Sequence, residues 1–211
     1  MDAGSLVSQV LALIRGSVAE QVEERIREFK ILHLKGNEDW FSELCFCILT
    51  ANSSAKLGIS IQKTIGPEGF LRLPEDELVR LLRRLGHRFS ERRANFIVRA
   101  REFSNIKDIV VSFTGETQAR DWLAENVMGL GYKEASHLLR NVGYDDVAIL
   151  DRHVLRTMCD NRMIDEIPRG LTRRTYLEIE SKLRDLGAQL GMPLSKLDLY
   201  IWYMKTGYVL K

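Results

Sequence analysis

The stretch Asn126–His153 reads NVMGLGYKEASHLLRNVGYDDVAILDRH, and its pattern decides the fold. At its centre is the sequence Gly129–Leu130–Gly131, where glycines allow a sharp bend. Apolar residues at helical spacing lie on both sides of this turn: Leu123 and Val127 before it, and Ala135, Leu138 and Leu139 after it. The stretch therefore predicts two short helices joined by a tight hairpin.

The backbone of such a hairpin has the properties of an anion site. N–H groups at the start of the second helix point outward together, and the helix dipole adds positive potential there. A DNA phosphate fits this kind of site without sequence preference. A plain helix–helix turn with nothing bound is the commoner explanation of a bare Gly-x-Gly. Gly129 and Gly131 alone leave both interpretations open.

Two residues of reactive types follow the turn: Lys133, and Asp151 eighteen residues later. An amine is a nucleophile only when deprotonated, and a helix N-terminus with partial desolvation disfavours an ammonium group. Such an amine can attack a sugar C1′ and leave a Schiff base. A nearby carboxylate can assist deprotonation and offset positive charge on the sugar. Taken singly, a solvated lysine and an aspartate that caps the helix beginning near His153 are the ordinary alternatives.

The rest of the chain also predicts helices with short connections. Residues 38–49 are apolar nearly all round, which favours a buried central helix, with Asn37 as its N-cap. A later helix should end at Gly66–Pro67, and Thr172 should cap a long helix. Sustained alternation with a period of two is missing, so we predict an all-α fold of roughly ten short helices.

Composition bounds the class of protein. The chain has 211 residues, of which 45% are hydrophobic, enough for a packed core. A net charge of +2 neither requires nor excludes a nucleic-acid partner, so a local basic face would have to attract one. Cys45, Cys47 and Cys159 have no spacing of a disulfide framework, a zinc site or an iron–sulfur site. Neither a signal peptide nor a transmembrane stretch is apparent, and we expect a cytoplasmic, nucleoid-associated protein.

Longer motifs carry a resemblance to a known family. Gly129-Leu130-Gly131-Tyr132-Lys133, followed by Leu150-Asp151-Arg152-His153-Val154, resembles the helix-hairpin-helix DNA glycosylase superfamily. Lysine at this position resembles the bifunctional members, which cut the glycosidic bond and then the strand. The stretches LCFCILTANSSA (44–55), LGHRFSERRANFIV (85–98) and LDLYIWYMKTGYVLK (197–211) are similar to the compact archaeal-type 8-oxoguanine DNA glycosylases. The missing iron–sulfur cysteines of endonuclease III-type relatives also favour that branch.

The resemblance implies roles for individual residues. Lys133 matches the Schiff-base nucleophile of the family and Asp151 its acid/base partner. Asn52 matches the position whose side chain enters the gap left by a flipped base. In the compact branch the chain ends in a lysine that lies in the base pocket, and Lys211 fits that description.

Further contacts are predicted with alternatives. Phe89 and Trp202 are candidates for stacking on the extruded base, although Trp202 also fits a plain core position. Arg92 and Arg93 are candidates for phosphate contacts, or are simply solvated. Together with Asn52, Gly129 and Gly131, these arginines make up the predicted DNA-binding set. His137 and His153 are expected to serve packing or hydrogen bonding, and no metal site is predicted.

The family resemblance implies two helical lobes with a cleft between them. We expect 36–164 to form the hairpin lobe, and 1–35 with 165–211 the other. The implied activity is excision of 8-oxoguanine from duplex DNA, followed by strand cleavage through β-elimination, by a monomer that needs no cofactor. Alternatives are a glycosylase for another oxidised base, a non-enzymatic helix-hairpin-helix DNA-binding module, and a helical interaction protein without DNA.

Overall fold

The computed structural model describes residues 3–211, with side chains from Leu6 onward, and its regular elements over that range are all helical. The all-α prediction is confirmed. Contacts between Cα atoms divide the chain into two compact units, Met1–Lys30 with Gly143–Lys211, and Ile31–Val142. The boundaries predicted for the two lobes stay a prediction. In the described part of the chain, no helix is long and apolar enough to cross a membrane.

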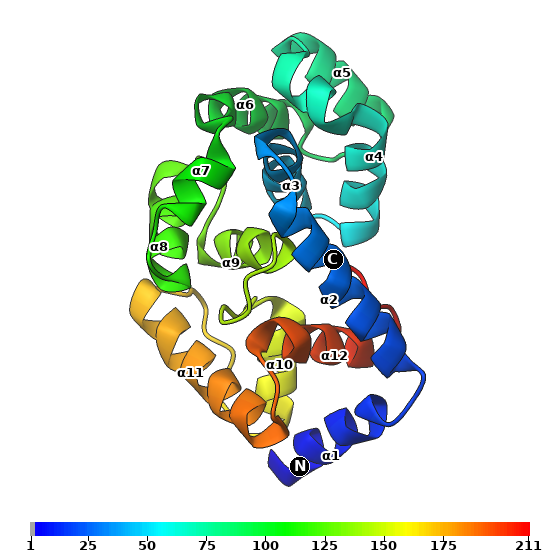
Figure 1. Ribbon diagram of the computed structural model, residues 1–211, viewed down its shortest axis with the longest axis vertical. Coiled ribbons are helices and arrows are strands. Elements are labelled where there is room, and N and C mark those ends of the chain that lie inside the picture. The colour runs from blue at the N-terminus through cyan, green and yellow to red at the C-terminus, as the bar shows by residue number, and fades with distance from the viewer. Residues whose placement is uncertain (1–2) are drawn as a thin grey trace. The chain divides into compact units, whose positions relative to one another are not determined.

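The unit Ile31–Val142 is built around one buried helix, α3 (Asn37–Thr50), whose residues 40–50 are all buried. The predicted central helix is confirmed. The other elements of this unit, after the last turn of α2 (Val18–Leu34), are α4 (Ala55–Arg72), α5 (Glu75–Arg84), α6 (Ser90–Ala100), the 3₁₀ turn η1 (Arg101–Phe103), α7 (Ile106–Val111), α8 (Glu116–Asn126) and α9 (Tyr132–Asn141). Figure 1 shows α3 among its neighbours, and it packs against α4, α6, α7 and α9.

One local prediction in this unit needs correction, and another is confirmed. Gly36, not Asn37, is the N-cap of α3, because the Asn37 Oδ1 accepts the Lys107 N–H at 2.9 Å and is therefore engaged with α7. The predicted helix end at Gly66–Pro67 is confirmed, because the backbone of Gly66 is not helical, with a φ of +69° and a ψ of 169°. Pro67 then begins a second helical segment of α4 that runs to Arg72, since proline is well suited to the first turn of a helix.

The buried carboxylate of Glu43 finds its hydrogen-bond donors within this unit. The carboxylate of Glu43, 2% exposed on α3, accepts hydrogen bonds from Asn141 at 2.6 Å and from Gln62 at 3.0 Å. The two donors stand on α9 and α4. A buried carboxylate is tolerated only when it is hydrogen-bonded, so this group fixes how three helices of the unit pack together.

The unit made from the two chain ends contains α1 (Ala3–Ile14), most of α2 (Val18–Leu34), α10 (Arg152–Asp160), α11 (Arg173–Leu190) and α12 (Leu194–Thr206). Helix α12 packs against α10, α11 and α1. The predicted cap is confirmed, since the Thr172 side chain accepts the Thr175 N–H at 3.2 Å and α11 begins at the next residue. Left-handed glycines end the last two helices, Gly191 after α11 and Gly207 after α12.

Candidate active site

The predicted hairpin joins α8 to α9, and its conformation requires glycine. Gly129 has a φ of +96°, in the left-handed region that favours glycine. A Cβ built on Gly129 would also lie 2.5 Å from Cδ2 of Phe96, on α6. Leu130 is buried and donates its N–H to the Val127 carbonyl at 3.1 Å. The turn is therefore held closed from within and lies directly against an aromatic ring.

Lys133 stands in the first turn of α9, beside the hairpin. Its side chain is 28% exposed, and its Nζ lies 3.2 Å from Oε1 of Glu134. The other oxygen of this carboxylate accepts the Gly131 N–H at 3.3 Å, which is half of a capping box. One carboxylate thus holds both the amino group and a turn N–H of the predicted anion site. The amine has to leave this ion pair before it can attack a carbon atom.

Asn52 lies at the tip of the turn that follows α3, exposed and in a left-handed conformation with a φ of +58°. Asparagine tolerates that region better than most residues. Three side chains from residues 87–93 donate hydrogen bonds to carbonyls at the end of α3 and in this turn. They are His87 to Leu49 at 2.9 Å, Arg93 to Ala51 at 2.5 Å and Arg88 to Asn52 at 3.3 Å.

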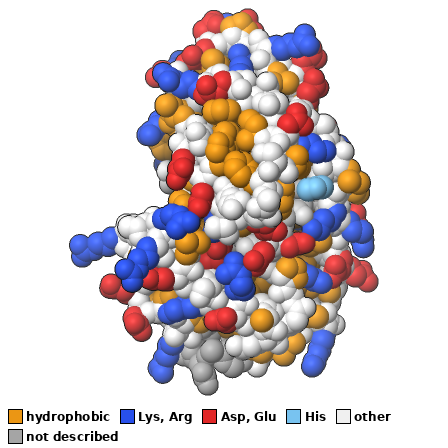
Figure 2. Space-filling view, turned by 60° about the vertical axis from the view of Figure 1, so that its left-hand side comes forward, with side chains coloured by type: hydrophobic (Ala, Val, Ile, Leu, Met, Phe, Trp, Pro, Cys, Tyr) orange, Lys and Arg blue, Asp and Glu red, His pale blue; other side chains and the backbone are white. Residues whose placement is uncertain are grey.

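The two neighbouring arginines of α6 differ sharply. Arg93 is 6% exposed, and burial lowers the pKa of its guanidinium from the usual value. Arg92 is exposed, with its guanidinium carbon 5.2 Å from the centre of the Phe96 ring. Figure 2 shows basic and acidic side chains interspersed over the face that it displays. Of the two predicted phosphate contacts, Arg92 is therefore the accessible one, while Arg93 is committed to the Ala51 carbonyl.

Asp151 is the N-cap of α10, as predicted. Its Oδ1 accepts the N–H groups of His153 and Val154, both at 2.8 Å, which leaves Oδ2 outside these two contacts. The side chain is partly exposed. A carboxylate held by one oxygen keeps a fixed direction and can still use the other oxygen.

The segment that leads to Asp151 is held by polar side chains of α11. The Tyr176 hydroxyl donates to the Ala148 carbonyl at 2.6 Å and accepts the Leu150 N–H at 3.2 Å. The Glu180 carboxylate accepts the Ala148 N–H at 2.7 Å. Both side chains are 1% exposed. These contacts replace the ladder hydrogen bonds that an extended segment would find in a sheet, and they set the position from which α10 begins.

Trp202, on α12, lies beside the first turn of α10. Its ring is 5.1 Å from that of His153 in an edge-to-face arrangement at 89°. The indole Nε1 is buried and has no hydrogen-bond partner among the described residues. A buried donor without a hydrogen-bond partner costs about 1–3 kcal/mol. Such a donor is typical of a site where a ligand or a water molecule supplies the missing acceptor. Lys211, also in this unit, is partly exposed, as is Phe89 in the unit Ile31–Val142.

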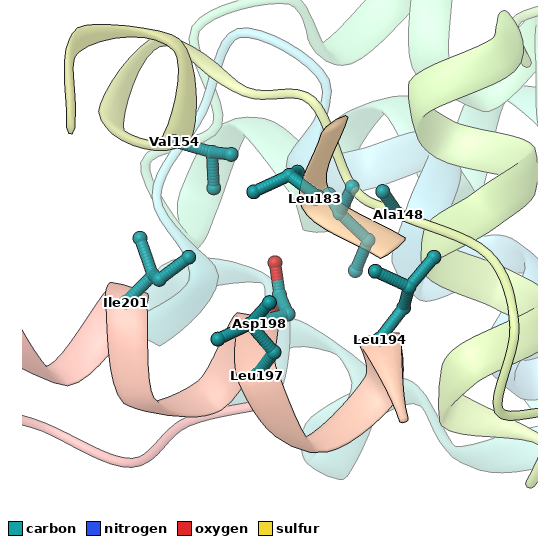
Figure 3. A pocket seen from close by; sticks show the side chains of 8 residues that line it. Ala148, Val154, Leu183, Leu194, Leu197, Asp198 and Ile201 are labelled. Atoms are coloured by element: carbon teal, nitrogen blue, oxygen red, sulfur yellow. The ribbon is translucent and has the colours of Figure 1, made fainter. Parts of the chain in front are cut away.

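Figure 3 shows a small hollow in the unit made from the two chain ends. Residues from both sides of Asp151 line it, together with side chains of α11 and α12: Ala148, Ile149, Val154, Leu183, Leu194, Leu197, Asp198 and Ile201. The Asp198 side chain points in among apolar groups. None of the predicted base-pocket residues lines this hollow, so it is not the pocket that the sequence predicted.

Several residues around these sites escaped the sequence analysis. Glu134 lies three positions after the N-cap glycine, where a capping-box glutamate is expected. The sequence pattern could therefore have predicted its contact with the hairpin. Tyr176 and Glu180 are four residues apart on an otherwise apolar face, a weaker signal. His87 left no signal, because the Leu49 carbonyl that its Nε2 binds lies 38 residues away in the sequence.

The chain is similar to known proteins over most of its length. Residues 22–192 match a family model described as 8-oxoguanine DNA glycosylase. The chain belongs to this family. A Methanocaldococcus jannaschii protein named 8-oxoguanine DNA glycosylase/AP lyase is 58% identical, over 98% of this chain and 99% of its own length.

Solved structures agree with the assignment to this 8-oxoguanine DNA glycosylase family. The Methanocaldococcus jannaschii 8-oxoguanine glycosylase/lyase in complex with 15mer DNA containing 8-oxoguanine has a TM-score of 0.96 and 57% identity, and the match covers 98% of this chain and all of that one. The Thermotoga maritima 8-oxoguanine DNA glycosylase has a TM-score of 0.94 and 43% identity, with 99% and 100% coverage. The helix-hairpin-helix fold is confirmed.

We predict that Gly129→Ala lowers the free energy of unfolding by about 2–4 kcal/mol, from left-handed strain and from overlap with the Phe96 ring. Gly86→Ala serves as a strain-only control, since Gly86 has a φ of +84° but nothing within 4 Å of the place that a Cβ would take. Its loss should be about 1–2 kcal/mol. Gly170→Ala, without positive φ or neighbours, should change little. Denaturant unfolding measures all three, and equal losses for Gly129→Ala and Gly86→Ala would contradict the packing argument.

We predict that Tyr176→Phe destabilises the protein by about 1–3 kcal/mol, because a buried carbonyl and a buried N–H lose their partner. Tyr203→Phe is the matched control, since Tyr203 is a partly exposed tyrosine of α12 without a hydroxyl hydrogen bond in the described chain. Guanidinium unfolding of both variants provides the test. Equal stability of the two variants would show that the hydroxyl does not hold the 148–150 segment.

Proposed function

We propose that this protein is a bifunctional DNA glycosylase/AP lyase that excises 8-oxoguanine from duplex DNA. The observation that carries the proposal is the position of Lys133. Within a chain that matches the 8-oxoguanine DNA glycosylase family over residues 22–192, an amine stands in the first turn after a Gly-Leu-Gly hairpin. The hairpin supplies phosphate-binding N–H groups, and the amine is the nucleophile that a combined glycosylase and lyase needs.

The proposed reaction starts at the sugar of the damaged nucleotide. The Lys133 Nζ, deprotonated, attacks C1′, and the C1′–N9 bond breaks with its electron pair leaving on the base, which then takes up a proton. The sugar ring opens to give a Schiff base between Nζ and C1′. Loss of a C2′ proton then expels the 3′ phosphate by β-elimination, which nicks the strand, and water releases the enzyme from the product.

Asp151 is proposed to act on charge and protons in this sequence. Its Oδ1 remains with the helix N-terminus, while Oδ2 is available to take a proton from the amine and to offset positive charge on the sugar. The cap therefore supports the catalytic role, because it aims the carboxylate. No cofactor is part of the proposal.

The remaining predicted residues are proposed to bind the DNA around this chemistry. Phe89 and Trp202 would stack on the extruded base, and Lys211 would lie in the same pocket. Asn52, exposed at the tip of its turn, would enter the gap in the duplex. Gly129, Gly131 and Arg92 would contact phosphates, and Arg93 would take part through the turn that it supports.

Two rivals differ in measurable ways. A glycosylase for another oxidised base would use the same chemistry and would be revealed by a panel of lesion duplexes, since pocket shape sets that choice. A non-enzymatic DNA-binding module would bind duplex in a salt-dependent way but release no base. A DNA-binding module has no need of the Lys133–Glu134 ion pair. In the enzyme, the same ion pair would hold the amino group beside the hairpin until the amine is deprotonated and attacks the sugar.

We predict that Lys133→Gln lowers the rate of 8-oxoguanine release by at least about a hundredfold and abolishes nicking, because an amide cannot form a Schiff base. Lys63→Gln, an exposed lysine of α4, is the control and should leave both rates unchanged. Single-turnover release and strand cleavage on one defined duplex are the measurements. Wild-type release without any nicking would keep the glycosylase and remove the lyase from the proposal.

We predict that Asp151→Asn and Asp151→Ala separate the cap from the chemistry. Asparagine still caps a helix, so Asp151→Asn should keep wild-type stability and lose base release by about a hundredfold or more. Asp151→Ala should lose the same activity and also about 1 kcal/mol of stability. An active Asp151→Asn variant would restrict Asp151 to the cap.

A further inference from the structure

His87 is a buried histidine to which the proposed chemistry assigns no role. It is 3% exposed and lies between the end of α3 and the start of α6. Its Nε2 is 2.9 Å from the Leu49 carbonyl, and its Nδ1 is 3.1 Å from the Phe89 nitrogen. Both ring nitrogens are thus engaged by the backbone of the same unit. One side chain bridges two segments that are 38 residues apart.

The chemistry of these partners fixes the state of the ring. A backbone N–H is only a donor, so Nδ1 must be the unprotonated acceptor. A backbone carbonyl is only an acceptor, so Nε2 must carry the proton. The imidazole is therefore neutral in a single tautomer. Burial lowers the pKa of His87, and the nearby guanidinium groups of Arg93 and Arg88 act in the same direction, so the neutral form is favoured.

The two ends of this bridge lead to two different parts of the proposed DNA site. Leu49 belongs to the last turn of α3, from which the chain passes through Ala51 to the exposed Asn52. At the other end, the N–H of Phe89 belongs to the residue whose ring is a candidate base-stacking group. The guanidinium of Arg93 spans the same two segments, since it binds the Ala51 carbonyl and lies 5.9 Å from the Phe89 ring centre.

We propose that His87 is a positioning residue that fixes Phe89 relative to the Asn52 turn. The Phe89 ring, which would stack on the extruded base, and the Asn52 side chain, which would fill the gap left in the duplex, would then move as one body. This inference rests on the proposed function, which gives Phe89 and Asn52 those roles. The bridge should affect the steps in which a base is extruded from the duplex and bound in the pocket. It should not affect strand cleavage after the base has been released.

A preformed abasic site therefore separates positioning from general structure. His87→Gln keeps an amide donor near Nε2 for Leu49, and His87→Asn keeps an amide acceptor near Nδ1 for Phe89, so each variant retains half of the bridge. Rates are measured in single turnover on a duplex with one 8-oxoguanine and on the same duplex with an abasic site. The melting temperature of each variant is recorded alongside.

We expect both variants to lose base excision by about tenfold or more, the size of loss that small misplacements of reacting groups produce. Strand cleavage at the abasic site should stay within about threefold of wild type. Addition of Asn52→Ala to His87→Gln should cost less than the two separate losses combined, because the two residues act through one element.

Three results would overturn the proposal. The first is an equal loss of rate on both duplexes that follows the fall in melting temperature, which would mean a structural role alone. The others are wild-type excision rates for both variants, and full additivity of the rate losses of His87→Gln and Asn52→Ala. Failure of the proposed function looks different, because wild type itself would then release no base from the 8-oxoguanine duplex. In that case its abasic-site cleavage tells whether the lysine chemistry survives.

Discussion

The contact between Gly129 and Phe96 is the constraint on which the unit Ile31–Val142 depends. A left-handed glycine lets the hairpin turn, and the absence of a side chain lets the ring of α6 lie where a Cβ would stand. Phe96 in turn belongs to the helix whose Arg93 holds the turn of Asn52. The hairpin that precedes Lys133 and the turn that carries Asn52 are thus both attached to α6, which holds these two parts of the proposed site in fixed positions within this unit.

In the unit made from the two chain ends, a different kind of contact fixes the position of Asp151. Asp151 has no close-packed glycine turn beside it, and its position comes from hydrogen bonds between α11 and the extended segment 148–150. Buried polar groups of this kind are costly unless every one is paired, so they define a single arrangement. Helix capping then fixes the direction of the carboxylate. The contacts that stabilise this segment therefore also set the position of the carboxylate to which we assign a role in the proposed reaction.

Sequence reasoning succeeded where the controlling physics is local. The N-cap of Asp151, the cap of Thr172 and the central helix α3, whose residues 40–50 are buried, each follow from a residue and its near neighbours, and the structure confirms them. It failed at Asn37, whose side chain is recruited by Lys107 seventy residues away. Tertiary partners also explain why the burial of Arg93 and the bridge of His87 were invisible. Nothing in a sequence tells an arginine that faces solvent from one that faces a distant carbonyl.

The identity of the nucleophile is the central claim, and a covalent adduct tests it most directly. Borohydride reduction during reaction with a duplex that carries one 8-oxoguanine would convert the Schiff base to a stable secondary amine. Protease digestion and mass spectrometry would then identify the modified residue. The account predicts the DNA remnant on Nζ of Lys133 alone. An adduct on another lysine, or on the N-terminal amine, would contradict it.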